Sequence, residues 1–391
     1  MIDIEKIRAE TPGIQFSTHL LACGSSLMPQ RVVDVILEHT QLEALMGGYE
    51  AEFQKIDDLN KIYDIVAEHI GANSHEIALM ENSTVAWSHA FYALPLKSGS
   101  RILTSEAEYA ANYVAFLQRA KRDNLTIDII PSDQNGTLDT NALEAMVDER
   151  VGLIAISWIP TNGGLVNPAE NVGKVAKKYN IPYLLDACQA AGQMQIDVNK
   201  IQCDFLSATG RKFLRGPRGT GFLYINEKWL GTIEPAMIDH FGAPWVKKNV
   251  YELREDARRF ETWENSYALR AGLGEAIKYA EEIGIDLIHE RVQLLAKFNR
   301  DLLSEIKNIQ LRDIGTEQCG IISFSIDEKN DPKEIVDQMS KAGFAIGLVD
   351  PESTLIDSEK RSLPTLLRMA PHYYNTEDEI EKAVKQVSLL L

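Results

Sequence analysis

A regular alternation of short apolar runs and longer amphipathic segments fills residues 76–225. Four of the intervening segments, 84–94, 110–122, 138–150 and 167–180, have helical periodicity and the length of crossover connections between parallel strands. The pattern predicts an α/β domain built on a mostly parallel sheet of seven strands. The expected strands are the apolar runs at 76–80, 101–105, 125–130, 151–157, 182–186, 204–208 and 220–225.

The pattern changes after about residue 263, where long helical segments replace the alternation. Helical periodicity at 264–284 and 286–306 is followed by strand-like runs at 319–326 and 344–349 and by further helical sequence. This order of elements predicts a smaller α+β domain. The expected division is a large domain of residues 26–262 and a small domain of residues 1–25 and 263–391.

The charge balance argues against a nucleic-acid partner, because a net charge of −17 repels a polyanion. No run approaches about 18 apolar residues, and the charged N-terminus lacks the apolar core of a signal peptide. We therefore expect a cytoplasmic protein with no membrane partner. The four cysteines, Cys23, Cys188, Cys203 and Cys319, lack metal-ligand spacing, so no metal site is predicted.

Asp186 and Lys212 indicate a particular chemistry. Asp186 ends an expected strand, where an open α/β sheet places residues that face a ligand, and Lys212 follows 26 positions later in a glycine-rich stretch. Pyridoxal phosphate needs both groups: a lysine that forms a Schiff base with it and a carboxylate that keeps its pyridine nitrogen protonated. Taken alone, Lys212 is more typical of a solvated lysine, and a structural cap or ion pair is an equally good interpretation of Asp186.

Asn82, Ser83 and Thr84 form a candidate phosphate site. They stand between an expected strand and the helical segment 84–94. Hydroxyl groups and free amides at a helix N-terminus favour an anion. The same residue types are the common N-caps of helices, so capping is the alternative interpretation, and the two are compatible.

The stretches LLDACQ at 184–189 and DFLSATGRKFLRGPRGTGFLYI at 204–225 resemble the cofactor region of the fold-type I, class V aminotransferase family. This family of pyridoxal-phosphate enzymes includes cysteine desulfurases, isopenicillin N epimerases, kynureninases and carbon–sulfur lyases. The resemblance covers nearly the whole chain and implies the same two-domain fold, pyridoxal phosphate as cofactor and a small amino-acid substrate. Further matching stretches are ENST at 81–84, EAEYAAN at 106–112, PTNGGLVNP at 160–168, RRFETWE at 258–264 and LLRMAPHYYNTEDEIEKAV at 366–384.

The resemblance assigns cofactor roles residue by residue. Lys212 matches the lysine that binds the cofactor covalently, and Asp186 matches the partner of the pyridine nitrogen. Gln189 matches the residue that hydrogen-bonds the phenolic oxygen of the ring. Thr209 matches a hydroxyl on the phosphate side, and Arg211 stands where desulfurases usually have histidine.

Three more residues complete the expected cofactor site. Ser83 and Thr84 match the phosphate contacts at the helix terminus. Tyr109 falls where family members stack an aromatic ring on the cofactor, and it is also the candidate acid for a leaving group. A core or edge aromatic is the alternative interpretation of Tyr109.

The expected substrate contacts come from two separate segments. Arg368 matches the arginine that pairs with the α-carboxylate of the substrate, a task that suits its fork of N–H donors. Thr161 and Asn162 lie in the loop expected to approach the outer face of the ring, and Asn162 is the predicted contact.

Two departures from the family narrow the expected activity. Cysteine desulfurases need a mobile nucleophilic cysteine ahead of the carboxylate-binding arginine, yet residues 320–391 contain no cysteine. Trp263 and Glu264 replace a Gly-Thr pair whose hydroxyl reaches the phosphate of the neighbouring subunit in desulfurases. Arg211 is expected to compensate for that lost contact.

The combined motifs are most similar to hercynylcysteine sulfoxide lyases of ergothioneine biosynthesis and related carbon–sulfur lyases. The resemblance implies β-elimination from a cysteine S-conjugate or its sulfoxide, with release of pyruvate and ammonia. An aminotransferase, an amino-acid epimerase and a binding protein without turnover stay open as alternatives. The resemblance also implies a homodimer, with MGGYEAEF at 46–53, around a helix break at Gly47 and Gly48, at its interface.

Overall fold

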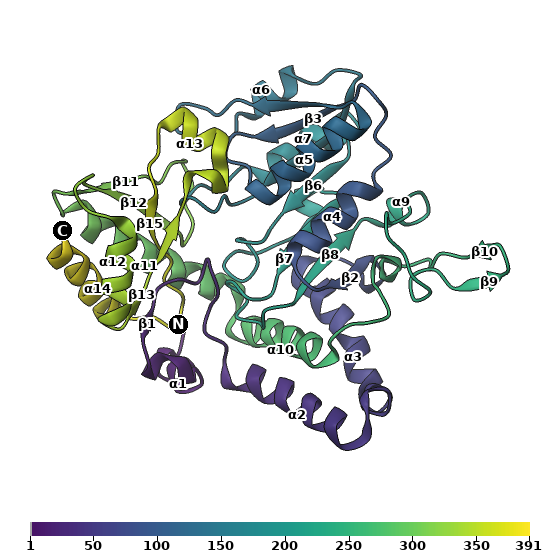
Figure 1. Cartoon of the computed structure of the whole chain (residues 1–391), viewed down its shortest axis with the longest axis horizontal. Helices are drawn as coiled ribbons and strands as arrows, with labels where there is room; N and C mark the ends of the chain where they lie inside the picture. Colours follow the sequence, from purple (N-terminus) through teal and green to yellow (C-terminus); the bar gives the residue numbers. More distant parts are fainter. Residues whose placement is uncertain (1) are drawn as a thin grey trace.

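The computed structural model describes residues 2–391, and its large sheet has seven strands (Figure 1). Five of these strands, β7, β6, β5, β3 and β4, are parallel neighbours, whereas β8 runs antiparallel between β2 and β7. The expected mostly parallel sheet is therefore confirmed. In spatial order the strands are β2 (Ile77–Met80), β8 (Gly221–Ile225), β7 (Phe205–Thr209), β6 (Tyr183–Asp186), β5 (Val151–Ser157), β3 (Arg101–Ser105) and β4 (Thr126–Ile130).

The strand order fixes where a ligand site can form. The chain passes from β3 to β4 on one side and then returns to β5 on the other side of β3. In open α/β sheets a ligand crevice forms at such a reversal, beyond the carboxyl ends of the strands. The loops after β3, β5, β6 and β7 begin at this edge. Strand β2 runs in the same direction as β7, so the loop after β2 begins there as well.

Helices cover the large sheet, and the four predicted helical segments correspond to α4, α5, α6 and α7. Helix α6 is shorter than the predicted 138–150, because Asp139 caps its start and the chain leaves the helix after Ala145. The helices that follow the strands of this sheet are α4 (Ser83–Ala93), α5 (Ala110–Asp123), α6 (Thr140–Ala145), α7 (Ala169–Lys178), α8 (Val198–Ile201) and α9 (Glu227–Leu230).

Two long helices precede the sheet and meet at the predicted glycine break. Helix α2 (Gln30–Met46) ends where Gly47 takes a φ of +97°, and α3 (Gly48–Ile70) begins at the next residue. A left-handed φ of this kind is favourable for glycine and strained for other residues. Helix α10 (Tyr267–Ile283) packs against both α2 and α3. None of the helices within residues 2–391 is long and apolar enough to cross a membrane.

The C-terminal part forms an antiparallel sheet of four strands with helices beside it (Figure 1), and the predicted runs 319–326 and 344–349 supply two of these strands, β12 and β14. Strand β1 (Thr18–His19), which follows the first helix α1 (Ile4–Ala9), pairs in parallel with β13 (Phe344–Ala345) of the C-terminal part in a separate sheet of two strands. The exact domain boundaries stay a prediction. The sheet order is β11 (Ile309–Leu311), β12 (Ile322–Ile326), β15 (Leu366–Met369) and β14 (Gly347–Val349), and the helices are α11 (Ile285–Ser304), α12 (Pro332–Lys341), α13 (Leu355–Arg361) and α14 (Glu377–Leu390).

A hairpin of β9 (Trp245–Lys247) and β10 (Val250–Tyr251) projects from the large domain at the right of Figure 1. All the residues of these two strands are exposed. The remaining elements are the 3-10 turns η1 (Pro12–Gln15), η2 (Ser74–Glu76), η3 (Ala257–Phe260) and η4 (Pro351–Thr354).

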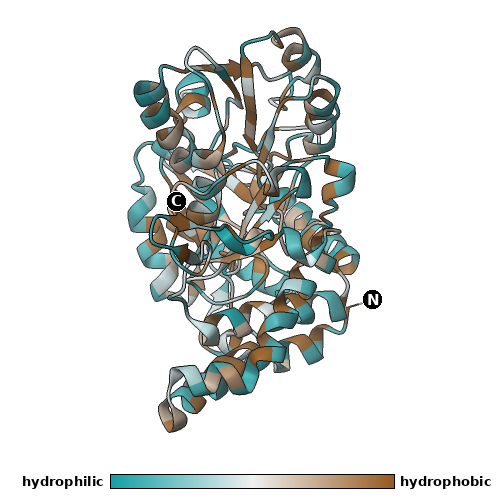
Figure 2. Ribbon diagram, turned by 90° about the vertical axis from the view of Figure 1, so that its right-hand side faces the viewer, coloured by the Kyte–Doolittle hydropathy of each residue, from teal (hydrophilic) through white to brown (hydrophobic). Residues whose placement is uncertain are grey.

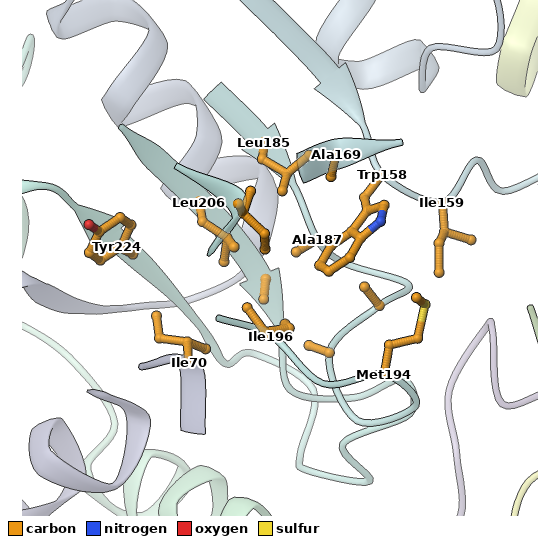
Figure 3. Packing of buried hydrophobic residues seen from close by; sticks show 14 of the residues in the cluster. Ile70, Trp158, Ile159, Ala169, Leu185, Ala187, Met194, Ile196, Leu206 and Tyr224 are labelled. Carbon is orange, nitrogen blue, oxygen red and sulfur yellow. The ribbon is translucent and has the colours of Figure 1, made fainter. Parts of the chain in front are cut away.

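The core lies on both faces of the large sheet. Leu185 and Leu206 pack into the cluster drawn in Figure 3, whereas their neighbours Leu184 and Phe205 pack into a second cluster. Side chains alternate between the faces of a strand, so apolar runs without polar alternation are typical of strands buried on both faces. In Figure 2, which colours each residue by its hydropathy, the outer helices carry both hydrophilic and hydrophobic residues. The strands whose carboxyl ends form the ligand edge are therefore packed on both faces.

Candidate active site

The N-terminus of α4 forms one wall of the site. Asn82 is the N-cap, and its Oδ1 accepts a hydrogen bond from the backbone N–H of Val85 at 3.0 Å. The Ser83 hydroxyl donates to Ser207 Oγ at 3.0 Å and so ties this turn to β7. Gly221 lies against the turn, because a Cβ there would come within 2.9 Å of the Asn82 carbonyl carbon. The capping interpretation is therefore confirmed for Asn82, and the free N–H groups of the first turn are available to an anion.

Asp186, at the carboxyl end of β6, is buried and held by two donors. Its Oδ1 accepts the backbone N–H of Cys188 at 2.9 Å, and its Oδ2 accepts the side-chain amide of Asn112 at 3.0 Å. A carboxylate with both oxygens engaged has a fixed orientation. Asp186 is therefore a rigid acceptor at the ligand edge of the sheet.

Lys212 and Arg211 follow β7. Burial lowers the pKa of the Lys212 amine below its ordinary value, Arg211 and Arg368 lower it too, and Cys188 and Asp186 act in the opposite direction. Such an amine loses its proton more readily than a surface lysine and is a better nucleophile. Arg211 donates from Nη1 to the carbonyl oxygen of Gly24, so it ties the N-terminal segment to the site.

A cavity of about 490 Å³ lies between these elements. It contains most of the predicted cofactor residues: Ser83, Thr84, Tyr109, Asp186, Thr209, Arg211 and Lys212 all line it. The structure therefore brings together groups that lie up to 129 positions apart in the chain. The other lining residues are Glu81, Asn82, Val85, Asn112, Cys188, Arg218 and Gly219.

Tyr109 and Thr209 meet the cavity in different ways. The Tyr109 side chain is 38% exposed, and burial of the rest of the ring raises the pKa of its hydroxyl. The Thr209 hydroxyl donates to the carbonyl oxygen of Thr220 at 3.2 Å. Because the hydroxyl proton of Thr209 is used in this bond, its oxygen can only accept further hydrogen bonds. The donors to an anion are therefore the N–H groups of α4 and Arg211.

Three predicted residues stand apart from the lining of this cavity. Arg368, on β15, donates from Nη1 to the carbonyl oxygen of Thr161 at 2.9 Å and to its hydroxyl at 2.6 Å. Thr161 is therefore the residue of that loop that contacts Arg368, and the adjacent Asn162 is buried. Gln189 donates from Nε2 to the carbonyl oxygen of Cys23 at 3.2 Å, while its Oε1 is buried without a hydrogen-bond partner.

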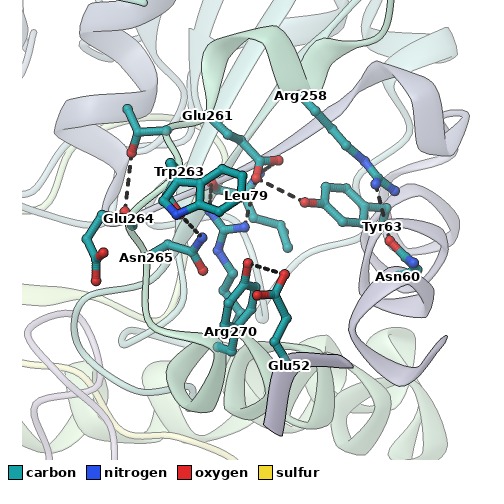
Figure 4. Close-up of polar contacts among 12 residues, drawn as sticks. Glu52, Asn60, Tyr63, Leu79, Arg258, Glu261, Trp263, Glu264, Asn265 and Arg270 are labelled. Atoms are coloured by element: carbon teal, nitrogen blue, oxygen red, sulfur yellow. Dashed lines mark hydrogen bonds and ion pairs between the residues drawn. The ribbon is translucent and has the colours of Figure 1, made fainter. Parts of the chain in front are cut away.

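The segment with Trp263 and Glu264 lies on a buried polar network (Figure 4). Glu261 accepts the Tyr63 hydroxyl at 3.0 Å, the backbone N–H of Leu79 at 2.9 Å and Arg270 Nη1 at 2.8 Å. Trp263 is 46% exposed and stacks on His240, with 4.9 Å between ring centroids. The base of this loop is therefore fixed, and Trp263 lies at the surface.

The class of protein follows from comparison with known families. The aminotransferase class-V family model matches residues 18–383. The chain therefore belongs to the aminotransferase class-V family. The members of this family are enzymes that use pyridoxal phosphate, which confirms the expected family, enzyme class and cofactor.

Individual relatives agree with this assignment. A probable cysteine desulfurase of Methanothermobacter thermautotrophicus is 26% identical over 382 residues, which cover 96% of this chain and 95% of the relative. The apo structure of a cysteine desulfurase from Thermococcus onnurineus NA1 matches with a TM-score of 0.93 and 25% identity, over 100% of this chain and 98% of that one. A complex of the cystine C–S lyase C-DES with its reaction product cysteine persulfide has the same fold, with a TM-score of 0.86 and 20% identity, over 97% and 99% of the two chains.

The residues present fit pyridoxal phosphate. The α4 N-terminus suits its phosphate, the fixed carboxylate of Asp186 suits a protonated ring nitrogen, and the Lys212 amine suits its aldehyde. Gln189 follows Asp186 by three positions, and its buried Oε1 has no hydrogen-bond partner.

Sequence reasoning missed several residues around the cavity, most clearly Glu108, Asn112 and Cys188. Asn112 bonds Asp186 directly, and Glu108 bonds Asn112 at 2.8 Å. Both residues stand in the stretch EAEYAAN beside Tyr109, but Glu108 precedes the N-cap of α5 and Asn112 lies in its first turn, so no helical periodicity links them. Cys188 follows Asp186 by two positions and lines the cavity, but from the sequence its thiol was considered only as a metal ligand.

Proposed function

We propose that this enzyme is a pyridoxal-phosphate-dependent carbon–sulfur lyase that performs β-elimination on a cysteine S-conjugate or its sulfoxide. In this reaction the bond between Cβ and sulfur breaks, and the sulfur leaves on the departing fragment as a thiol or a sulfenic acid. Water completes the conversion of the three-carbon remainder to pyruvate and ammonia. A hercynylcysteine sulfoxide, as used in ergothioneine biosynthesis, is the specific substrate that the sequence motifs favour.

The proposed roles follow the geometry of the cavity. Lys212 binds the cofactor and then, as a free amine, removes the α-proton of the substrate, which its lowered pKa favours. Asp186 holds a proton on the ring nitrogen, and the bound cofactor supplies an electron sink for the charge that develops at the α-carbon. Ser83, Thr84 and Arg211 bind the phosphate. These roles need no residue beyond those that line the cavity.

Substrate recognition and the leaving group involve two more residues. Arg368 binds the α-carboxylate through the N–H groups that Thr161 does not occupy, since only Nη1 contacts Thr161. Tyr109 donates a proton to the departing sulfur group, because burial keeps its hydroxyl protonated. The proposed role of Asn162 is a substrate contact, and that of Gln189 is a hydrogen bond to the phenolic oxygen of the cofactor ring.

The observation that carries the proposal is the placement of the thiols. A desulfurase forms a persulfide on a reactive cysteine, but Cys23, Cys203 and Cys319 are buried. Cys188 lines the cavity, and burial raises the pKa of its thiol to about 12. The segment between β14 and β15, where desulfurases carry their nucleophile, is folded into η4 and α13 and contains no cysteine. A thiol is a poor nucleophile without its thiolate, so sulfur is expected to leave with the fragment.

Cysteine desulfurase is the second candidate, because the relatives carry that name. An aminotransferase and an amino-acid epimerase also begin by removing the α-proton, and the same cavity suits them. The C–S lyase with this fold supports elimination as a reaction that the architecture accommodates.

Product analysis tests the proposal. The loaded enzyme is incubated separately with cysteine, S-alkyl cysteines and their sulfoxides, and pyruvate, ammonia, alanine and D-amino acids are measured. Pyruvate and ammonia in equal amounts support the lyase. Alanine with an enzyme-bound persulfide supports the desulfurase, a D-amino acid supports the epimerase, and amination of an added oxo acid supports the aminotransferase.

A further inference from the structure

Glu108 is a buried carboxylate with no role in the reaction described above. It follows β3, its side chain is 3% exposed, and five donors surround it. Two backbone N–H groups, of Ser157 at 2.8 Å and Tyr109 at 3.0 Å, are among them. The hydroxyls of Ser157 at 2.6 Å and Thr104 at 3.1 Å and the amide of Asn112 at 2.8 Å complete the set. Because backbone N–H groups can only donate, this environment suits an ionised carboxylate.

Asn112 connects Glu108 to the site. Its Nδ2 group donates at 2.8 Å to Glu108 and at 3.0 Å to Asp186, so one amide bridges two carboxylates. Both carboxylates lie at the ligand edge of the sheet, Glu108 after β3 and Asp186 at the end of β6. Asn112 also lines the cavity, whereas Glu108 is not one of its lining residues.

We propose that Glu108 and Asn112 are positioning residues: Asn112 fixes the orientation of Asp186, and the negative charge of Glu108 strengthens the hold of Asp186 on a protonated ring nitrogen. This inference rests on the proposed function, because it needs a cofactor whose ring nitrogen meets Asp186. Glu108 also accepts the backbone N–H of Tyr109. One carboxylate therefore positions Tyr109 directly and Asp186 through Asn112.

Glu108 and Asp186 interact electrostatically. Burial raises the pKa of Glu108, and the charge of Asp186 raises it further, against the hydrogen bonds of Ser157 and Asn112. The two carboxylates repel each other, and a cation placed against Asp186 relieves this repulsion. The other titratable groups facing Asp186 are Lys212, Cys188 and Tyr109, and Tyr183 lies next to Glu108. Among these groups only Lys212 brings a positive charge.

Glu108→Gln removes the charge and keeps the shape, and Asn112→Leu removes the bridge. The matched control is Glu106→Gln, which removes a carboxylate of the same loop that instead pairs with Lys360. Each variant is loaded with pyridoxal phosphate, and the pH dependence of the bound cofactor's absorbance, the cofactor Kd and kcat are measured. For Glu108→Gln we expect the absorbance transition to move to lower pH by about one unit and kcat to fall about tenfold. For Asn112→Leu we expect about a tenfold higher cofactor Kd, with Glu106→Gln unchanged.

The outcomes separate this inference from the proposed function. If the parent enzyme takes up no cofactor at Lys212, both fail together. If the parent is loaded normally and Glu108→Gln shifts the transition by less than about 0.3 unit, the inference alone is overturned. If Glu108→Gln does not fold, Asn112→Leu decides: a cofactor Kd within twofold of the parent overturns the inference, and a tenfold rise supports it. Far-UV circular dichroism identifies which variants fold.

Discussion

Arg215 donates from Nη1 to the Tyr373 hydroxyl at 2.9 Å, and this bond joins the loop of Lys212 to the segment that follows Arg368. The same guanidinium donates to Thr11 Oγ1 at 2.7 Å and to the carbonyl oxygen of Leu27 at 2.8 Å. All three acceptors are neutral, and the side chain is fully buried. Arg215 therefore clamps three chain segments together: the loop that contains Lys212, the N-terminal segment with Thr11 and Leu27, and the segment that follows Arg368.

Replacing Arg215 is expected to destabilise the fold strongly. Arg215 has a φ of +60°, so Arg215→Asn is the informative change, because asparagine tolerates that backbone conformation. Loss of three buried hydrogen bonds should lower the free energy of unfolding by about 3 kcal/mol, and Tyr373→Phe by about 1 kcal/mol. Urea unfolding measures both. Equal stability of Arg215→Asn and the parent would contradict the clamp.

His372 should make stability depend on pH. Its Nε2–H donates to the carbonyl oxygen of Phe213 at 2.8 Å, and burial, with the charge of Arg215 second, holds the pKa of His372 well below its usual value. The folded state therefore binds fewer protons than the unfolded state, so this contribution is complete above about pH 6.5 and is lost as the pH falls below it.

The variant His372→Gln tests this dependence. We expect it to lower the Tm at pH 7.5 and to flatten the fall in Tm between about pH 6.5 and pH 5. His75→Gln is the control, because His75 is exposed. An unchanged slope in His372→Gln would show that other groups cause the acid sensitivity.

The strands of the large sheet could be predicted from the sequence because an apolar run is a local pattern. Each of the seven apolar runs became a strand, and Asp186 and Thr209 end strands at the ligand edge. Asn112 and Arg215 were missed because their partners come from packing: Asn112 contacts Asp186 across 74 positions, and Arg215 contacts Thr11 across 204. No local pattern specifies such pairs. The contact of Arg368 with Thr161, and not with Asn162, has the same origin.

Lys212→Ala is expected to abolish the borohydride-trapped cofactor adduct and turnover. The amine of Lys212 combines a lowered pKa with a position on the same cavity as Asp186. Mass spectrometry of the reduced enzyme locates the adduct. An adduct on another lysine would show that the assignment is wrong.

A homodimer is expected, with the corner between α2 and α3 at its interface. Leu45 and Phe53 at this corner are 84% and 82% exposed, which is unusual for large apolar side chains. Phe53→Asp combined with Leu45→Lys should shift the mass in solution toward a monomer. The control is Leu389→Lys, a side chain that is 71% exposed on α14, away from this corner (Figure 1). Analytical ultracentrifugation measures the result, and a monomeric parent with full activity would refute the dimer.

Tyr109→Phe should separate proton removal from sulfur departure. In the proposed lyase Lys212 removes the α-proton, whereas the Tyr109 hydroxyl protonates the leaving group. The variant should therefore slow pyruvate release by about 10²-fold while α-proton exchange in deuterated water falls much less. The parent should also convert sulfoxides faster than thioethers, because a sulfenate is the better leaving group, and the advantage of Tyr109 should be larger for thioethers. If the variant slows exchange and elimination equally, Tyr109 acts by stacking on the cofactor and another group supplies the proton.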